Sequence, residues 1–302
     1  MLHGVLPVNK PNGMTSHDVV SQVRRLTRQK RIGHTGTLDP EVKGVLPLCL
    51  GQATRIVENV QEMPKRYRGS LVLGVATDTE DQTGRVIEEA EVGPLSLEHV
   101  DDVLRRFVGK IHQTPPMYSA VKVGGKRLYE WAREGVEVER PTREVVIHQL
   151  ERVGFEPGDR PRLDLDVWCS KGTYVRTLFV DIGRELGAPA HLSALVRTQS
   201  GPFSLHDSWS LEALEKVAEQ GDWNKVLVSI GETLSHLPAV TVTDADRKRV
   251  ENGVPLPWNG KPLGAEPGTR FRILTESGQC CALYRLMEDQ PVLKPEKVFR
   301  VR

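Results

Sequence analysis

The spacing of apolar and polar residues along the chain predicts a mixture of strands and helices. Runs of apolar or alternating residues predict strands at residues 5–8, 67–75 and 163–169. Apolar residues at helical spacing predict helices at residues 17–26, 97–107 and 175–186. Thr15 or Ser16 can cap the first of these helices, and Ser96 can cap the second.

The pattern changes near residue 236. Residues 208–235 are weakly acidic and helical, whereas the tail contains short strands and turns, with strands expected at 271–275 and 281–286. Because 302 residues exceed the usual size of one small domain, we expect a main domain of residues 1–236 and a small β-rich domain of residues 237–302.

Residues 112–143 are expected to form an insertion within the main domain. The segment combines a proline pair, a hairpin turn and a short helix, located at Pro115-Pro116, Gly124-Gly125 and around Tyr129 and Trp131. Several Lys and Arg residues lie among these aromatics, which suits a mobile arm that touches RNA.

Composition and charge exclude several classes of protein. Hydrophobic residues make up 38% and charged residues 27% of the chain, which is typical of a globular protein and excludes general disorder. The formal net charge is only +1, so a nucleic acid would have to bind a local basic patch. One candidate patch lies between residues 22 and 36, which contain no acid and five cations: Arg24, Arg25, Arg28, Lys30 and Arg31. The alternative interpretation of this run is a solvated helix face.

The cysteines and histidines suggest neither a disulfide framework nor a metal site. Four cysteines without a C-x-x-C pair indicate reduced thiols, and no stretch approaches the ~20 apolar residues of a membrane span. We therefore expect a soluble cytoplasmic protein that does not enter a membrane. The nine histidines lack H-E-x-x-H and H-x-H spacing, so we expect no metal and no cofactor.

The densest candidate site is Gly33-His-Thr-Gly-Thr-Leu-Asp-Pro40. Its two glycines allow the backbone to approach a ligand closely, and the Asp-Pro turn can present the Asp39 carboxylate. The segment lacks the G-K-[ST] ending of a phosphate-binding loop, which makes a nucleotide hydrolase the weakest hypothesis. Taken alone, Asp39 is more often an ordinary turn residue.

Two further segments carry candidate residues. Cys169-Ser-Lys-Gly-Thr-Tyr-Val-Arg176 joins a strand to a helix, a place where sites are commonly built, although Tyr174 could equally be a core residue and Arg176 an ordinary ion-pair partner. Lys65-Arg-Tyr-Arg68 could stack Tyr67 on a base, or could be a cation-protected edge strand.

Taken together and in this order, five motifs resemble the TruB family of tRNA pseudouridine synthases. They are Gly4-Val-Leu-Pro-Val-Asn-Lys-Pro-Asn-Gly-Met-Thr-Ser16, Gly33–Pro40, Lys65-Arg-Tyr67, Pro116-Met-Tyr-Ser-Ala-Val-Lys122 and Ser170-Lys-Gly-Thr-Tyr-Val-Arg176. The resemblance covers residues 4–205 closely and the remainder loosely. It implies a mixed α/β fold, in which a twisted, largely antiparallel sheet is flanked by helices. It also implies that the insertion is the family's thumb, and that the tail is a small PUA-like RNA-binding domain.

The resemblance implies isomerisation of the T-loop uridine at tRNA position 55 to pseudouridine. Asp39 would be the nucleophile, Arg176 its bidentate partner, and Tyr174 the pocket tyrosine in the position of a general base. The reaction exchanges no electrons and hydrolyses nothing, so it requires no cofactor. Whether Asp39 attacks C1′, adds to C6 or assists loss of the base stays open at this point.

The resemblance also implies a set of substrate-binding residues. Tyr67 would stack on the target base, His34 would help to extrude the nucleotide, and Leu195 would line the pocket, with Lys65 and Lys171 as further substrate contacts. The partner is expected to be the tRNA elbow, bound by a monomer without guide RNA.

Two departures from the family pattern lie near these residues. Val42-Lys43-Gly44 replaces the usual Ala-Thr-Gly, which places a cation and more bulk beside Asp39. Leu195-Val196-Arg197 replaces Leu-Arg-Arg, which leaves Arg197 as the expected phosphate contact.

Two other functions compete with this one. A non-catalytic RNA-binding protein would use the same surface without needing Asp39. A guide-RNA-dependent synthase of the dyskerin type is disfavoured by the thumb-like insertion and by the lack of a long basic tail.

Overall fold

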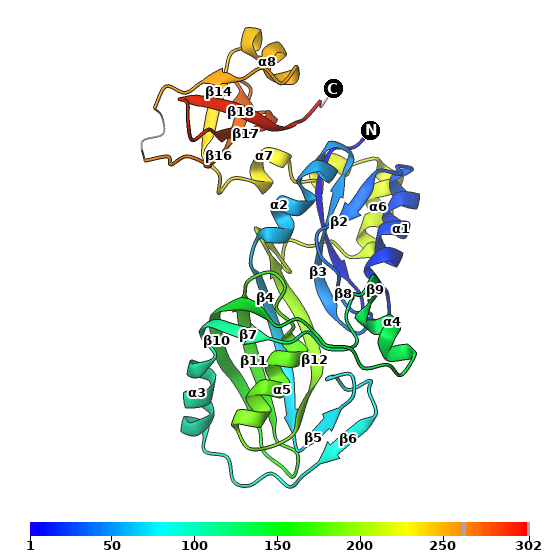
Figure 1. Ribbon diagram of the computed structural model, residues 1–302. Coiled ribbons are helices and arrows are strands. Elements are labelled where there is room, and N and C mark those ends of the chain that lie inside the picture. The colour runs from blue at the N-terminus through cyan, green and yellow to red at the C-terminus, as the bar shows by residue number, and fades with distance from the viewer. Residues whose placement is uncertain (261–263, 301–302) are drawn as a thin grey trace.

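A twisted, largely antiparallel sheet of nine strands runs through most of the chain (Figure 1). The computed structural model describes residues 1–260 and 264–300. The strands follow the spatial order β1-β3-β12-β4-β11-β10-β7, with β2 paired to β3 and β13 paired to β12. Their bounds are β1 (Gly4–Lys10), β2 (Ile32–His34), β3 (Lys43–Leu50), β4 (Lys65–Leu73), β7 (Gly109–Gln113), β10 (Arg143–Glu156), β11 (Arg162–Cys169), β12 (Ala190–Ser200) and β13 (Phe203–Ser204). The predicted mixed fold is confirmed.

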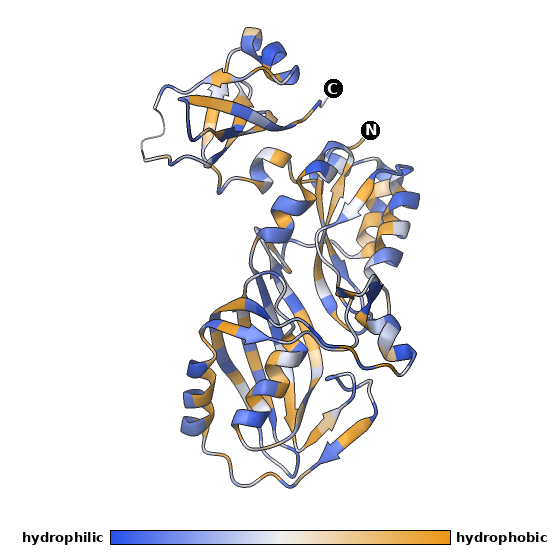
Figure 2. Ribbon diagram, viewed as in Figure 1, coloured by the Kyte–Doolittle hydropathy of each residue, from blue (hydrophilic) through white to orange (hydrophobic). Residues whose placement is uncertain are grey.

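Helices pack on the sheet in two groups. One core lies under α3 and α5, against β4, β10, β11 and β12, and the other under α1 and α6, against β1 and β3. The helical elements are α1 (Ser16–Thr27), η1 (Gly51–Ile56), α2 (Val57–Glu62), α3 (Leu97–Arg106), α5 (Val175–Glu185), α6 (Leu211–Gln220), η2 (Trp223–Lys225) and α7 (Ile230–Thr233). Figure 2 shows apolar and polar residues mixed along both the strands and the helices.

The predicted helices begin where their caps indicated. Thr15 accepts a hydrogen bond from the backbone N–H of Asp18, whose carboxylate accepts one from the Thr15 N–H, so a capping box starts α1. Ser96 accepts a hydrogen bond from the N–H of His99 at the start of α3. The predicted helices at 17–26, 97–107 and 175–186 are thus confirmed to within a residue or two.

The strand predicted at 67–75 is wrong at its end. β4 stops at Leu73, and a separate strand β5 (Val75–Thr77) turns away to pair with β6 (Val86–Glu89). Gly74 between them has φ +91°, a backbone conformation that interrupts a strand and that favours glycine.

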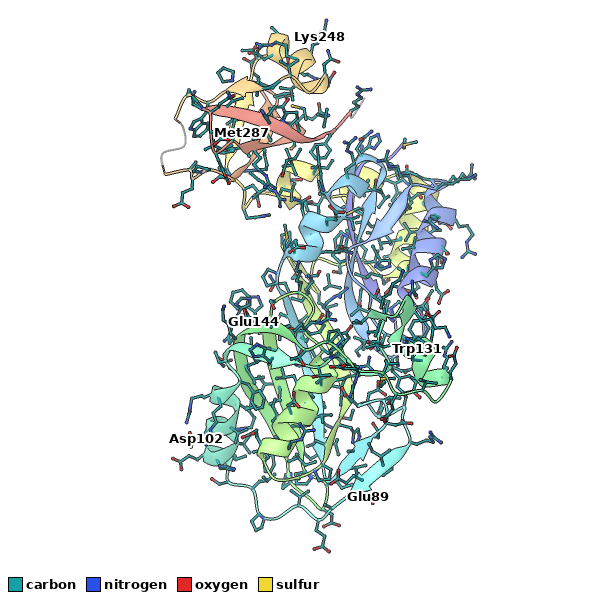
Figure 3. The ribbon with its side chains drawn as sticks, viewed as in Figure 1. Glu89, Asp102, Trp131, Glu144, Lys248 and Met287 are labelled. Atoms are coloured by element: carbon teal, nitrogen blue, oxygen red, sulfur yellow. The ribbon has the colours of Figure 1, made fainter. Side chains whose placement is uncertain are left out.

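The insertion forms the predicted hairpin and short helix. The hairpin consists of β8 (Lys122–Val123) and β9 (Lys126–Arg127), and α4 (Leu128–Arg133) follows at once. Trp131, labelled in Figure 3, donates its indole N–H to the Val123 carbonyl and lies under the Lys126 ammonium group, 4.4 Å from the ring centre. The helix therefore packs mainly on its own hairpin.

A second sheet of five strands forms the tail, in the order β14-β16-β17-β18-β15. Its elements are β14 (Ala239–Val242), α8 (Asp244–Glu251), β15 (Leu256–Pro257), β16 (Arg270–Thr275), β17 (Cys280–Leu286) and β18 (Val292–Val298), which confirms the strands expected at 271–275 and 281–286. Leu283 of β17 and Phe299, which follows β18, share a buried cluster with Ile56 and Val60, so the two domains are packed together through side chains. No helix in the described part of the chain is long and apolar enough to span a membrane.

The main sheet has two halves, one with β1, β2 and β3 and the other with β12, β4, β11, β10 and β7. The two halves meet at a parallel pairing of β3 with β12. Lys43 pairs with Val196, and Gly44 pairs with Arg197. Gly44 has φ +116°, and a Cβ atom at this position would lie 2.2 Å from the carbonyl oxygen of Arg197. The strands can therefore approach this closely only because residue 44 has no side chain.

Gly44→Ala should lower the free energy of unfolding by more than the ~1–3 kcal/mol expected for backbone strain alone, since the new methyl group also overlaps the Arg197 backbone. Urea denaturation measures this loss. Gly13→Ala is the matched control, because Gly13 also has positive φ but nothing lies within 4 Å of the position of its Cβ. Equal losses in the two variants would contradict a required close approach of β3 and β12.

Candidate active site

Asp39 lies in the loop between β2 and β3, and hydrogen bonds with buried groups fix the position of this loop. The Ser16 hydroxyl accepts a hydrogen bond from the Leu38 N–H at 2.9 Å and donates one to the Leu38 carbonyl at 3.2 Å. The Val42 N–H donates to the Asp39 carbonyl at 3.0 Å and closes the turn. The backbone on both sides of the Asp39 carboxylate is therefore fixed.

Lys10 supports the same loop, although the sequence prediction missed it. Its ammonium group is fully buried and donates hydrogen bonds to the carbonyls of Pro11, Met14 and Pro40. Burial lowers the pKa of Lys10, and the nearby carboxylates of Asp39 and Glu41 oppose that shift. Lys10 therefore joins the end of β1 to the residue that follows Asp39.

Arg176 binds Asp39, but not in the predicted bidentate manner. Its Nη2 lies 3.2 Å from Oδ2 of Asp39, while the Arg176 side chain is 9% exposed and that of Asp39 is 50% exposed. The other terminal nitrogen, Nη1, donates to the Thr79 carbonyl at 2.9 Å and lies 3.3 Å from a carboxylate oxygen of Asp81. The bidentate prediction is wrong because a second carboxylate takes half of the guanidinium group.

The same guanidinium group joins three segments that are distant in sequence. Nη2 of Arg176 also donates to the Tyr118 carbonyl, at 2.9 Å, at the base of the insertion. Asp81 is in turn held by the hydroxyls of Thr79 and Thr83 and by the N–H of Thr83. The sequence analysis did not single out Asp81, because its partner lies 95 residues away.

Seven of the eight predicted site residues line one cavity of about 480 Å³, which we call the tyrosine cavity. They are Asp39, Lys65, Tyr67, Lys171, Tyr174, Arg176 and Leu195. His34, the eighth, is on β2 and is not among the lining residues. Burial lowers the pKa of His34, and the N–H of Gly36 lies 3.4 Å from its Nδ1.

The two tyrosines of this cavity come from different elements. Tyr67 is on β4, paired with Arg197 of β12, and burial raises the pKa of its hydroxyl while the Arg197 cation opposes the shift. Tyr174 caps the start of α5, where its N–H and carbonyl bind the side-chain amide of the buried Gln113 at 3.0 and 3.2 Å. Both rings are partly buried, and the backbone fixes their positions.

The two lysines of the cavity already have protein partners. Lys65 is buried, and its ammonium group donates to the carbonyls of Gln61 and Met63 at the end of α2. Burial lowers the pKa of Lys65 to about 8. Lys171 is exposed and forms an ion pair with Glu62.

A second cavity of about 610 Å³ shares Asp39, Val42, Arg176 and Leu195 with the first. The two family departures meet on its wall, since Lys43 and Val196 pair across β3 and β12 and both line it. Val42 is buried in the core, and the Lys43 side chain is exposed.

Arg197 is not the predicted phosphate contact. It is 1% exposed, and it donates from Nε to the Val45 carbonyl at 2.7 Å and from Nη2 to the Gly36 carbonyl at 3.3 Å. Its guanidinium group therefore binds the backbone of β3 and of the loop that precedes β3. Sequence alone did not reveal this burial, because an arginine next to Val196 has no pattern that marks it as internal.

No group of three or more His, Cys, Asp and Glu side chains is placed to hold a metal ion in residues 1–260 and 264–300. The chemically distinctive arrangement is instead a half-exposed carboxylate, held by a buried arginine at the edge of a cavity with two tyrosines.

Family models match the chain over the segments that carry this arrangement. The model of the TruB family pseudouridylate synthase N-terminal domain matches residues 24–175, and that of the tRNA pseudouridylate synthase B C-terminal domain matches residues 176–234. The chain belongs to the TruB family. Proteins named tRNA pseudouridine synthase B from Bacillus pumilus and Bacillus licheniformis are 48% and 49% identical to it, with 99% of this chain and 98% of each relative covered.

Solved structures related to the TruB family share the fold. A chain from an H/ACA RNP bound to a substrate RNA containing 2′-deoxyuridine is 25% identical, and one from a Cbf5-Nop10-Gar1 complex is 28% identical. Both have a TM-score of 0.75 and cover 99% of this chain and 86% of theirs. The likeness extends over both sheets of this TruB-family protein.

Proposed function

We propose that this protein converts the uridine at position 55 in the T loop of tRNA to pseudouridine, without a guide RNA. The observation that carries the proposal is the Asp39–Arg176 pair at the edge of a cavity lined by Tyr67, Tyr174 and Leu195. The name tRNA pseudouridine synthase B, borne by relatives of similar length, supports the same reaction.

The reaction breaks the N1–C1′ bond of uridine, turns the detached uracil, and joins C5 to C1′, after which the C5 proton leaves and N1 takes up a proton. Asp39 supplies the carboxylate for the step at the sugar or the base. The buried Arg176 binds that carboxylate and orients it. The half-exposed position of Asp39 leaves its second oxygen available to the substrate.

The other groups of the tyrosine cavity hold the base. Extruding a nucleotide from its stack costs a few kcal/mol, and stacking on an aromatic ring returns about 1–3 kcal/mol per base. Tyr67 provides that ring, Leu195 the apolar wall, and Tyr174 the acceptor for the C5 proton. His34, next to the cavity on β2, takes the space that the extruded nucleotide leaves.

The two lysines would contact the RNA backbone. Exposed ion pairs such as Lys171–Glu62 contribute only about 0–1 kcal/mol, so Lys171 can exchange its carboxylate for a phosphate at little cost. Lys65 contributes a buried positive charge beside the same cavity.

The proposed function also gives each part of the chain a role. We assign residues 1–236 to catalysis, residues 112–143 to a thumb that closes on the T arm, and residues 237–302 to a PUA-like RNA-binding domain, of which the structure describes all but 261–263 and 301–302. We place the protein in the cytoplasm as a monomer. Its four cysteines are buried and free, which supports a reducing compartment.

Asp39→Asn should lower pseudouridine formation in an unmodified tRNA by at least about 10³-fold, because the amide cannot supply the carboxylate chemistry. Affinity for the tRNA should change little, since the volume at residue 39 is kept. Conversion is measured with purified protein, without guide RNA, and binding is measured by filter retention.

Glu41→Gln is the control for charge, since Glu41 is the next acidic residue and lines only the second cavity. Wild-type protein that binds tRNA without converting it would favour a non-catalytic RNA-binding protein. Conversion that appears only when guide RNA is added would favour a guide-dependent synthase, the second alternative raised by the sequence.

Asp81→Asn should lower kcat about tenfold, equal to ~1.4 kcal/mol, with a much smaller change in KM. Asp81 does not need to touch substrate for this effect, because its charge orients the guanidinium group that orients Asp39. Single-turnover kinetics measure the rate. Asp78→Asn is the matched control in the same loop, since Asp78 binds Arg85 and not Arg176; an equal loss in both variants would indicate a general disturbance of the loop.

Binding should weaken steeply with salt, because the run at residues 24–31 exposes Arg25, Arg28 and Lys30 without a carboxylate partner among the described residues. Arg28→Gln combined with Lys30→Gln should reduce the slope of log affinity against log salt by about 1.5, given ~0.7–0.9 per phosphate contact. Arg105→Gln combined with Arg106→Gln is the charge-matched control on α3, where both arginines pair with acids. An unchanged slope in the first variant would remove this patch from the RNA-binding surface.

A further inference from the structure

The hydroxyl of Ser119 is buried without a hydrogen-bond partner in the part of the chain that the structure describes. The residue is 5% exposed, and it lines the tyrosine cavity at the base of the insertion. Leaving a buried hydroxyl unpaired costs about 1–3 kcal/mol, and most such groups in native proteins are paired. An unpaired hydroxyl beside a binding cavity therefore points to a partner that arrives with the substrate.

Backbone groups on both sides of the Ser119 side chain are, in contrast, hydrogen-bonded. The Tyr118 carbonyl accepts from Arg176 at 2.9 Å, and the Ser119 carbonyl accepts from the N–H of Tyr129 in α4 at 3.1 Å. Ser119 thus lies between the guanidinium group that holds Asp39 and the helix of the insertion. A hydrogen bond formed by its side chain would therefore affect the positions of both Arg176 and α4.

The location distinguishes Ser119 from the other unpaired polar groups. Among the described residues, the remaining buried polar side-chain atoms without a partner are Nε of Arg24, Oγ1 of Thr198 and Oγ of Ser200. None of these three residues lines either cavity at Asp39. Ser200 is fully buried, so it offers a hydroxyl of the same kind away from the site.

We propose that Ser119 is a substrate-binding residue, whose hydroxyl forms a hydrogen bond with the target nucleoside once the insertion closes. This inference rests on the proposed function, since that nucleoside is the uridine in the tyrosine cavity. A hydroxyl both donates and accepts, so it matches the carbonyl and imide groups of uracil as well as a ribose hydroxyl. Through the Tyr129–Ser119 hydrogen bond, an occupied cavity also holds α4 in place.

Ser119→Ala tests the proposal, because a substrate-binding role and a structural role predict opposite results. Removing an unpaired hydroxyl should leave the free energy of unfolding in urea unchanged or higher. The same variant should lower kcat/KM about tenfold, chiefly through KM. Ser119→Thr, which keeps the hydroxyl, should recover most of that loss, and Ser200→Ala should change neither quantity.

Binding to RNA with an abasic site at the target position locates the contact. If wild type and Ser119→Ala bind this RNA equally, the hydroxyl contacts the base; if the variant still binds about tenfold more weakly, it contacts the ribose. A kcat/KM for Ser119→Ala within twofold of wild type would overturn the proposal, as would a loss of stability with unchanged kinetics. Wild-type protein that converts no uridine would refute the proposed function instead, which keeps the two failures distinct.

Discussion

The parallel pairing of β3 with β12 is the constraint on which the site depends. Asp39 belongs to the half of the sheet built from β1, β2 and β3, whereas Tyr67, Tyr174 and Arg176 belong to the half that contains β4, β11 and β12. The halves approach within backbone contact at Gly44, and the buried Arg197 bonds carbonyls of the first half from a strand of the second. A buried guanidinium group is tolerated only when its N–H groups are paired, so this cation also fixes the register of the junction. Without that register the carboxylate and its cavity would not meet.

Arg176 contacts two carboxylates, and these two groups lie in different environments. The Asp81 side chain is 20% exposed and accepts three hydrogen bonds from Thr79 and Thr83 besides its contact with Arg176. Asp39 is half exposed, and Arg176 is the side-chain partner found for it among the described residues. A carboxylate that accepts several hydrogen bonds has fewer lone pairs left for a substrate, whereas one with a single partner keeps a free oxygen. The geometry therefore leaves Asp39 the more available of the two for reaction.

Local signals in the sequence predicted the helices well and the site only in part. Thr15 and Ser96 marked helix starts because a cap is a local interaction, complete within four residues. β12 was not recognised, since its irregular register at Leu192–Ala194 and Arg197–Gln199 breaks the alternation that identifies a strand. Asp81 and Lys10 were missed because their partners are set by the fold and not by spacing. The pairing of Asp39 with Arg176 came from family resemblance, and only its detail, one oxygen and not two, required the structure.

The contrast between the Asp39 loop and the insertion indicates how the protein combines precise chemistry with a large substrate. Buried hydrogen bonds with Lys10 and Ser16 fix the backbone on both sides of Asp39, which restricts the movement of its carboxylate. Between residues 117 and 143 Leu128 is the buried apolar residue, and Trp131 packs against its own hairpin. Segments with few buried contacts to the remainder of a protein open at low free energy. The insertion can therefore move as one unit on the backbone near Tyr118 while Arg176, anchored also by Thr79 and Asp81, stays in place. Under the proposed function, the rigid groups perform the reaction and the loosely attached insertion covers the RNA.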